Sequence, residues 1–299
     1  MYDSQFKVFL LFLQFHDIDV SNVDVTVVLS FIEFLIYNGL SHNSIAAYVG
    51  AVKAKFLVYN LPIEMFQHQW VRMILKSTSR NLPACHRIKG ILSIAELRKL
   101  VNICDSMHNG YVYKALFLLA FFAFLKLSNL VPSSINMYDK LRHLSRGDFI
   151  IVNNQAFVII KWSKTLQAQS DHAVIQLPTL GSSELCPVKA IKCMMDKVPL
   201  PPHSPMFVLP CGGSHVCLTE SKVRKTLKDI INHMGLDPLT LPFHSFRRSG
   251  ASWAFANNVA IQEIQSHGTW SSEAVWRYIV TNPTNQKSVA NTFQNLLHT

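Results

Sequence analysis

The residues best suited to chemistry lie in the stretch 241–280, near the C-terminal end of this 299-residue sequence. A His244-x-x-Arg247 motif is followed by His267 and then by Tyr278. Arginine forks match phosphate oxygens in a bidentate manner, and imidazoles exchange protons near neutral pH. A phenol can attack phosphorus as a nucleophile. Together these residue types indicate chemistry on a phosphodiester.

These motifs resemble those of the tyrosine recombinase (phage integrase) superfamily. The wording HSFRRSGASWAF, then HGTWSSEAVWRYI, with FFAFLKLSNLVP upstream, is most similar to the recombinases of DIRS/Ngaro-type eukaryotic retroelements. The resemblance covers residues 6–278. It implies cleavage and rejoining of DNA, in which Tyr278 forms a 3′-phosphotyrosyl bond and releases a 5′-hydroxyl. The bond energy is stored in this link, so the resemblance implies no metal and no other cofactor.

The resemblance assigns a role to each residue of the motif. Arg247 would hold the phosphate, His244 would share the tyrosine proton, and His267 would hydrogen-bond a phosphate oxygen. Structural alternatives stay open: a half-buried helical tyrosine, a capping histidine and a partly buried histidine at a helix end. Trp270 could pack over the site, donate its indole N–H or simply fill the core. Arg248 faces another side of the helix and is expected at the surface or on the DNA backbone.

A lysine in a β-hairpin is the general acid that the resemblance implies. Lys164 lies where a predicted strand gives way to a turn, so its ammonium could reach a minor groove and protonate the leaving 5′ oxygen. Lys161 is the alternative, and strict alternation places it on the opposite face of the strand. Lys164 could instead be an ordinary solvent-exposed lysine at a turn.

The sequence departs from the family pattern at Lys126, where the family carries its first arginine, and Asn129 replaces an acidic residue often found there. Lysine keeps the charge but loses the planar fork. Loss of one such donor costs on the order of 10²–10³ in rate, whereas DNA affinity is spread over many phosphates and falls far less. Two interpretations therefore stay open: a strand-transfer enzyme impaired to some degree, and a DNA-binding protein derived from a mobile element. A monomeric topoisomerase using the same chemistry is a third.

Composition limits the class of protein. Hydrophobic residues make up 49% of the chain, which favours a folded core. A net charge of +10 suits a polyanionic partner, and nucleic acid is a better fit than a membrane surface. The six cysteines form no Cys-x-x-Cys pair, so we expect reduced thiols. The longest apolar run, 115–125, is too short to span a bilayer.

We predict a mainly α fold with a small antiparallel sheet (α+β). An N-terminal helical (SAM-like) domain that binds the DNA core site is expected at 1–82, a linker at 83–91 and the catalytic domain at 92–299. The expected partner is double-stranded DNA, bound by a homo-tetramer that is a monomer when free. The resemblance to eukaryotic retroelements implies integration of a mobile element in the nucleus.

Spacing of apolar residues predicts the elements of both domains. The N-terminal helices are expected at 6–15, 25–37, 42–59 and 65–79. The catalytic domain should hold helices at 94–107, 111–125, 188–197 and 221–234, strands at 149–152, 156–162 and 173–177, a loop at 199–210 and an amphipathic tail at 286–297. Basic residues that could contact DNA are Lys53, Lys55, Arg72, Lys76, Arg80, Arg87 and Arg248.

Overall fold

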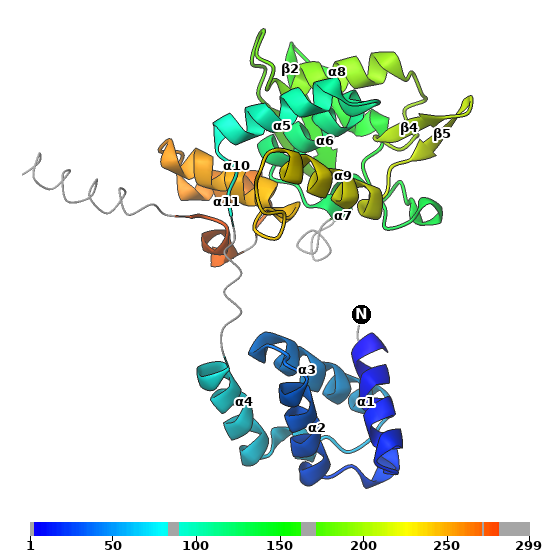
Figure 1. Cartoon of the computed structure of the whole chain (residues 1–299), viewed down its shortest axis with the longest axis vertical. Coiled ribbons are helices and arrows are strands. Elements are labelled where there is room, and N and C mark those ends of the chain that lie inside the picture. The colour runs from blue at the N-terminus through cyan, green and yellow to red at the C-terminus, as the bar shows by residue number, and fades with distance from the viewer. Residues whose placement is uncertain (1–2, 83–89, 163–171, 271, 281–299) are drawn as a thin grey trace, which may run out of the picture. The chain divides into compact units, whose positions relative to one another are not determined.

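The structure is a computed structural model that describes residues 3–82, 90–162, 172–270 and 272–280. Its contacts divide the chain into two compact units, Met1–Arg87 and Ile88–Thr299, each described by itself below (Figure 1). Helices predominate, and the described strands form a three-stranded antiparallel sheet and a two-stranded hairpin. The predicted fold class, mainly α with a small antiparallel sheet, is confirmed.

The first unit is a bundle of four helices: α1 (Asp3–Phe15), α2 (Val25–Tyr37), α3 (His42–Val58) and α4 (Gln69–Asn81). Local side chains define the helix starts, since the Asp24 carboxylate accepts the Val27 N–H at 2.9 Å. Phenylalanines fill the centre, where the rings of Phe9 and Phe31 meet edge to face at 4.8 Å. The unit therefore has a hydrophobic core of its own.

The last helix of this unit starts later than the predicted residue 65. A short 3₁₀ turn, η2 (Glu64–Gln67), comes first. His68 then has an extended backbone with ψ 145°, and its side chain accepts the Trp70 N–H at 3.3 Å. This cap ends the turn and begins α4, so the apolar pattern that suggested one helix belongs to two elements.

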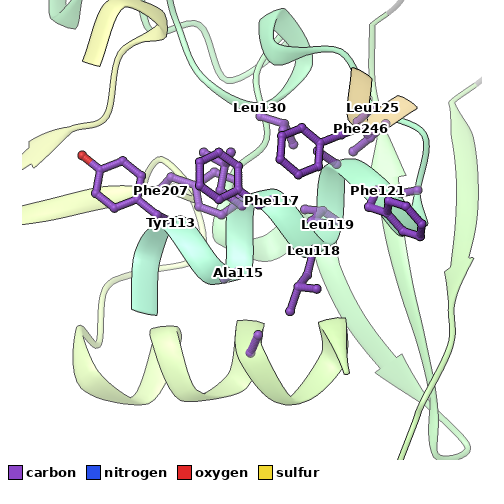
Figure 2. Close-up of a cluster of buried hydrophobic side chains, with 14 of the residues drawn as sticks. Tyr113, Ala115, Phe117, Leu118, Leu119, Phe121, Leu125, Leu130, Phe207 and Phe246 are labelled. Carbon is purple, nitrogen blue, oxygen red and sulfur yellow. The ribbon is translucent and has the colours of Figure 1, made fainter. Parts of the chain in front are cut away.

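The second unit is organised around α6 (Gly110–Phe122), of which ten residues are buried (Figure 2). The helices α5 (Ile94–Ser106), α8 (Pro187–Lys197) and α10 (His244–Ala256) pack against it. Phe117 of α6 stacks on Phe246 of α10 with the ring centroids 5.1 Å apart. Burial of one such side chain contributes about 1.5–3 kcal/mol. Hydrophobic packing on α6 thus fixes α10, the helix that carries the His-x-x-Arg motif.

The sheet consists of β1 (Phe149–Val152), β2 (Gln155–Ile160) and β3 (Ala173–Leu177), in that order. Asn153 and Asn154 form the first turn with φ of 48° and 64°, as a tight two-residue hairpin requires. All three strands were expected, but β2 begins at Gln155 and ends at Ile160, two residues before the predicted end. The predicted turn that follows β2 lies largely outside the described residues.

A second hairpin corrects the prediction that 199–210 is entirely loop. It pairs β4 (Val208–Cys211) with β5 (Ser214–Cys217). The two residues between the strands, Gly212 and Gly213, have φ of 53° and 81°. A Gly-Gly pair is a recognised signal for a two-residue hairpin, so the turn chemistry outweighs the neighbouring prolines.

The remaining elements are mostly short: α7 (Leu127–Leu130), η3 (Ile135–Met137), η4 (Arg146–Asp148), α9 (Glu220–His233), α11 (Ile261–His267) and η6 (Glu273–Arg277). The Ser93–Glu96 capping box opens α5 as predicted. The tail predicted at 286–297 lies outside the described residues. Within the described part of the chain, no helix is long and apolar enough to cross a membrane.

Candidate active site

The position of Arg247 depends on a close approach between α10 and α6. Gly250, one turn further along α10, has no Cβ, and a Cβ there would overlap the carbonyl oxygen of Phe121. This approach brings Arg247 under the C-terminal end of α6, where the side chain is 4% exposed. The deep burial of Arg247 is therefore a consequence of helix packing.

Backbone carbonyls hold the Arg247 guanidinium. Nη1 donates to the carbonyl of Phe124, and Nη2 donates to that of Gly268 at 2.7 Å. Phe124 has a positive φ of 50° just after α6. Carbonyls at a helix C-terminus lack partners inside the helix and carry partial negative charge, so they suit a cation. Nε is buried with no hydrogen-bond partner among the described residues, which leaves donors for a ligand.

No carboxylate neutralises this cation, since none of the ion pairs among the described residues involves Arg247. Burial lowers the pKa of Arg247 to about 10, and its interaction with the Tyr278 side chain partly offsets this effect. The guanidinium is still protonated at neutral pH. A buried cation without a counter-charge is costly and is typical of a site that binds an anion.

Tyr278 lies directly after η6, and three candidate site side chains surround its ring. The ring centroid is 5.1 Å from that of His244, 5.0 Å from that of Trp270 and 5.3 Å from the Arg247 guanidinium carbon. Ser252 of α10 holds the backbone here, because its hydroxyl donates to the Tyr278 carbonyl and accepts the Val280 N–H. The structure thus brings His244, Arg247 and Tyr278 together.

Trp270 covers the guanidinium. Its ring centroid is 3.9 Å from the Arg247 guanidinium carbon, a cation–π distance, and the side chain is 9% exposed. Gly268 makes room, because a Cβ at that position would overlap the indole ring. The indole Nε1 is buried and has no hydrogen-bond partner among the described residues. Of the options left open by the sequence, the structure shows packing over the site.

His267 is turned towards α6. Its Nε2 lies 2.8 Å from the carbonyl of Phe122, to which it donates, and its ring is in edge contact with Phe124 at 4.8 Å. Burial lowers the pKa of His267, and the nearby charge of Arg247 lowers it further. A neutral imidazole has a single N–H. Because this N–H donates to a helix carbonyl, the ring has none left to donate to a phosphate. In this arrangement Trp270, and not His267, carries the unused donor.

Solved structures of DNA-bound recombinases have the same fold. The XerH site-specific recombinase bound to its palindromic difH substrate matches with a TM-score of 0.62 at 16% identity, over 97% of this chain and 77% of that chain. The Tn1549 transposon integrase with circular intermediate DNA matches at 0.57 and 13% identity, over 90% and 85%. A lambda integrase dimer bound to a core site matches at 0.54 and 13%, over 87% and 65%.

This chain has the tyrosine recombinase fold. No protein-family model matches its sequence, and a search of curated proteins found no match. At 13–16% identity, the structural likeness shows the fold alone. The predicted closeness to DIRS/Ngaro-type elements stays a prediction.

Lys126 occupies the position at which the tyrosine recombinase resemblance places the first arginine. It is partly buried at the start of α7, two residues after Phe124, whose carbonyl holds Arg247. Asn129, at the other departure, is 6% exposed and donates from Nδ2 to the Trp162 carbonyl at 2.8 Å. An ionised carboxylate has no hydrogen to donate, so only the amide makes this contact between α7 and the end of β2.

The structure describes only one of the two candidate general acids, Lys161. The Lys161 Nζ lies 2.6 Å from Asp148 Oδ2 in an ion pair whose side chains are 15% and 11% exposed, and it also donates to Ser145 Oγ at 3.2 Å. Lys161, the first residue after β2, is therefore engaged in holding the end of the hairpin strand to η4. Lys164 lies outside the described residues, and its role stays a prediction.

The expectation that Arg248 lies at the surface is wrong. The side chain is 6% exposed, and Nη1 donates to the Gly90 carbonyl at 3.1 Å. Its neighbour Ser249 accepts the Leu92 N–H at 2.7 Å. Burial also lowers the pKa of Arg248. Arg248 and Ser249 thus fasten α10 to the segment that leads into α5.

The basic residues of the first unit differ in exposure. Arg72, Lys76 and Arg80 are exposed and recur every four residues along α4, which places them on one face. Lys53 and Lys55 of α3 are partly buried, and Lys55 is paired with Asp3. Arg87 lies outside the described residues. Contact of these side chains with DNA stays a prediction.

The described residues contain no cluster of three or more metal-ligating side chains. Among the described residues, the positive charge of this site comes chiefly from Arg247. The structure brings together Arg247, His244 and Tyr278, the residues that the sequence motifs singled out, and their roles stay predictions. No side-chain motif could reveal the carbonyls of Phe122, Phe124 and Gly268.

Proposed function

We propose that the protein cleaves and rejoins DNA through a covalent 3′-phosphotyrosyl intermediate on Tyr278. The observation that supports this most is the buried Arg247 guanidinium, which has no carboxylate partner among the described residues and faces the Tyr278 ring. A scissile phosphate would supply the missing negative charge. The three solved structures named above are DNA complexes, one of them described as post-cleavage.

In the proposed reaction, the phenolic oxygen of Tyr278 attacks phosphorus and the bond to the 5′ oxygen breaks. His244, in ring contact with Tyr278, takes the phenolic proton, and Lys164 gives a proton to the departing 5′ oxygen. The free N–H groups of Arg247 and the ammonium of Lys126 hold the non-bridging oxygens as charge develops. Attack by a 5′-hydroxyl of another strand then reverses these steps, so no external energy source is consumed.

Trp270 is the better candidate for the additional phosphate donor. Its Nε1 is buried without a partner among the described residues, whereas the Nε2 of His267 donates to a helix carbonyl. We assign His267 to positioning, since it ties the end of α11 to α6. This assignment replaces the direct phosphate contact that the sequence suggested for His267.

A nicked duplex tests the reaction, because loss of the short fragment beyond the nick traps the covalent intermediate. The wild-type chain, incubated with nicked duplexes of randomised sequence, should give a protein–DNA adduct that survives denaturing electrophoresis. Tyr278→Phe should abolish the adduct while leaving DNA binding intact. An adduct that persists in Tyr278→Phe would assign the nucleophile elsewhere and contradict the proposal.

Lys126 supports a second candidate function, that of a DNA-binding protein with weakened catalysis that derives from a mobile element. Lysine at this position cannot grip a phosphate in a bidentate manner. In this case the wild-type chain binds DNA without forming an adduct, and Lys126→Arg restores adduct formation. If Lys126→Arg leaves the amount of adduct unchanged, the lysine is not what limits catalysis.

The biological role of the reaction and the assembly that performs it are also proposals. The resemblance to retroelement recombinases supports integration of a mobile element in a eukaryotic nucleus, by four copies of the chain on two paired DNA sites. Sedimentation of the protein alone should give a monomer, and addition of cleavable DNA should give a complex of four chains. A free tetramer would contradict assembly on DNA.

A further inference from the structure

A pocket of about 420 Å³ lies outside the Arg247–Tyr278 site, between α7, the segment 133–143, Trp162 just after β2 and the start of α9. Its volume is within the range of small-molecule sites, about 300–1,000 Å³. Ser128 and Trp162 form part of its wall. Ser128 comes two residues after Lys126, and the Trp162 backbone is tied to the same helix through Asn129. The pocket is therefore built on the segment that carries a proposed phosphate-binding lysine.

Flat side chains form two stacked pairs in the wall of this pocket. The Arg142 guanidinium carbon is 5.4 Å from the Trp162 ring centroid. The rings of Tyr138 and His143 are stacked with centroids 5.9 Å apart and an angle of 27°. Aromatic rings and arginine planes are the surfaces on which proteins stack unpaired bases.

The polar groups favour a neutral base over a phosphate. The carboxylates of Asp139 and Glu220 line the pocket together with Arg142, and they would repel a phosphate. Each is already paired with an arginine, Asp139 with Arg142 at 3.6 Å and Glu220 with Arg224 at 2.8 Å. A carboxylate has further acceptor sites, which suit the exocyclic amine of cytosine or adenine.

Two further polar groups could bind the edge of a base. The Asp139 N–H donates to Nδ1 of His143 at 3.0 Å, and burial lowers the pKa of His143. Nδ1 also lies 3.2 Å from the Asp139 carbonyl, so Nε2 is a donor or an acceptor according to the tautomer. The Tyr138 hydroxyl is buried and has no hydrogen-bond partner among the described residues. Unused polar groups beside stacking surfaces are typical of a site that recognises a base.

We propose that this pocket takes up one unpaired nucleobase with an exocyclic amine, such as cytosine or adenine, from the DNA strand beside the cleavage position. The inference rests on the proposed function, because a strand must leave its partner before its 5′-hydroxyl can attack another strand. The base stacks against the Arg142–Trp162 pair, and the Asp139 and Glu220 carboxylates accept hydrogen bonds from its amine. The pocket would hold the freed strand during exchange.

The test compares three mixed-sequence duplexes: fully paired, with one unpaired cytosine and with one unpaired thymine. Affinity for the full-length chain is measured by fluorescence anisotropy. We expect the duplex with unpaired cytosine to bind about tenfold more tightly than the paired duplex, the effect of one base–aromatic stack, and more tightly than the thymine duplex. Trp162→Ala should remove this preference without weakening binding to the paired duplex.

Two matched variants serve as controls. Trp162→Phe keeps a stacking ring and should retain most of the preference. Trp253→Ala removes another tryptophan, 46% exposed on α10, and should leave the preference unchanged. Equal affinity for all three duplexes would overturn the proposal. A Trp162→Ala variant that lost affinity for each duplex by the same factor would also overturn it.

The adduct assay separates this proposal from the proposed function. A Tyr278-dependent adduct without a cytosine preference overturns the pocket proposal alone. A cytosine preference without any adduct, in the wild type and in Lys126→Arg, overturns the strand-transfer function and supports base binding. A chain that binds none of the duplexes contradicts both.

Discussion

Arg247 combines three properties at the scale of a single residue: burial, charge and contact with the Tyr278 ring. Arg247→Lys keeps the charge but loses the fork that reaches the carbonyls of Phe124 and Gly268 as well as a phosphate. We expect adduct formation to slow by about 10²–10³-fold, with little change in DNA affinity. Single-turnover rates and anisotropy measure the two effects.

Arg248→Lys is the matched control for this change. Arg248 is also buried, but its hydrogen bond goes to Gly90. We expect Arg248→Lys to lower the melting temperature with a much smaller loss of rate. Equal loss of rate in the two variants would show that Arg247 acts only through folding.

Gly268→Ala tests the packing of Trp270 on Arg247. The backbone of Gly268 has φ −83°, which alanine adopts without strain, so the substitution acts only through overlap with the indole ring. Overpacking of this kind typically costs about 1–3 kcal/mol. We expect lower stability and slower adduct formation, measured by denaturant unfolding and single-turnover cleavage. Gly50→Ala, which meets nothing within 4 Å, should be close to neutral or slightly stabilising.

Side-chain motifs in the sequence predicted only part of this candidate site. Residue types and spacing identified Arg247, His244 and Tyr278, because side-chain chemistry makes them distinctive. The same reasoning placed Arg248 at the surface and gave His267 a phosphate contact. The burial of Arg248 arises from packing against the 90–93 segment, a distant contact that helical spacing does not encode. The contact of His267 with the Phe122 carbonyl is also distant in sequence, and its phosphate contact stays a prediction.

At the scale of the element, backbone carbonyls at and just after the C-terminal end of α6 accept hydrogen bonds from both α11 and α10. His267 joins α11 to this end as a neutral imidazole with a lowered pKa. As pH falls below about 6.5, the unfolded chain takes up a proton at this residue before the folded chain does. The free energy of unfolding should therefore decrease with falling pH, by at most about 1.4 kcal/mol per pH unit for this group.

His267→Gln should flatten this dependence, because glutamine can donate to the Phe122 carbonyl without titrating. Urea unfolding between neutral and mildly acid pH measures the slope. His143, whose pKa is also lowered, keeps its own contribution in this variant. An unchanged slope in His267→Gln would show that His267 does not titrate as described.

Most elements were predictable because they follow local rules. Asp24, the Ser93–Glu96 box and the Asn153–Asn154 turn mark boundaries by hydrogen bonds or backbone angles within a few residues. Gly212–Gly213 carried the same kind of signal, but the nearby prolines concealed it. The ion pair of Lys161 with Asp148 joins two elements, and only the tertiary structure reveals it.

At the scale of the whole molecule, the net charge of +10 has a measurable consequence. Binding to DNA should release counterions, so affinity should fall steeply with salt, by about 10³–10⁵ between 50 and 200 mM for 6–10 phosphate contacts. Lys76→Gln on the exposed face of α4 should reduce the slope by about one. A flat dependence in the wild type would contradict an interface built on phosphates.

The groups that hold Arg247 include two backbone oxygens, those of Phe124 and Gly268, and every amino acid supplies such an oxygen. Substitutions at position 124 can therefore change the side chain while the acceptor remains. Much of what orients the guanidinium is thus set by the path of the backbone, which the residue identities alone do not reveal. Two chains with few identical residues can consequently present the same cation to the same ligand, provided that α6 ends with the same bend.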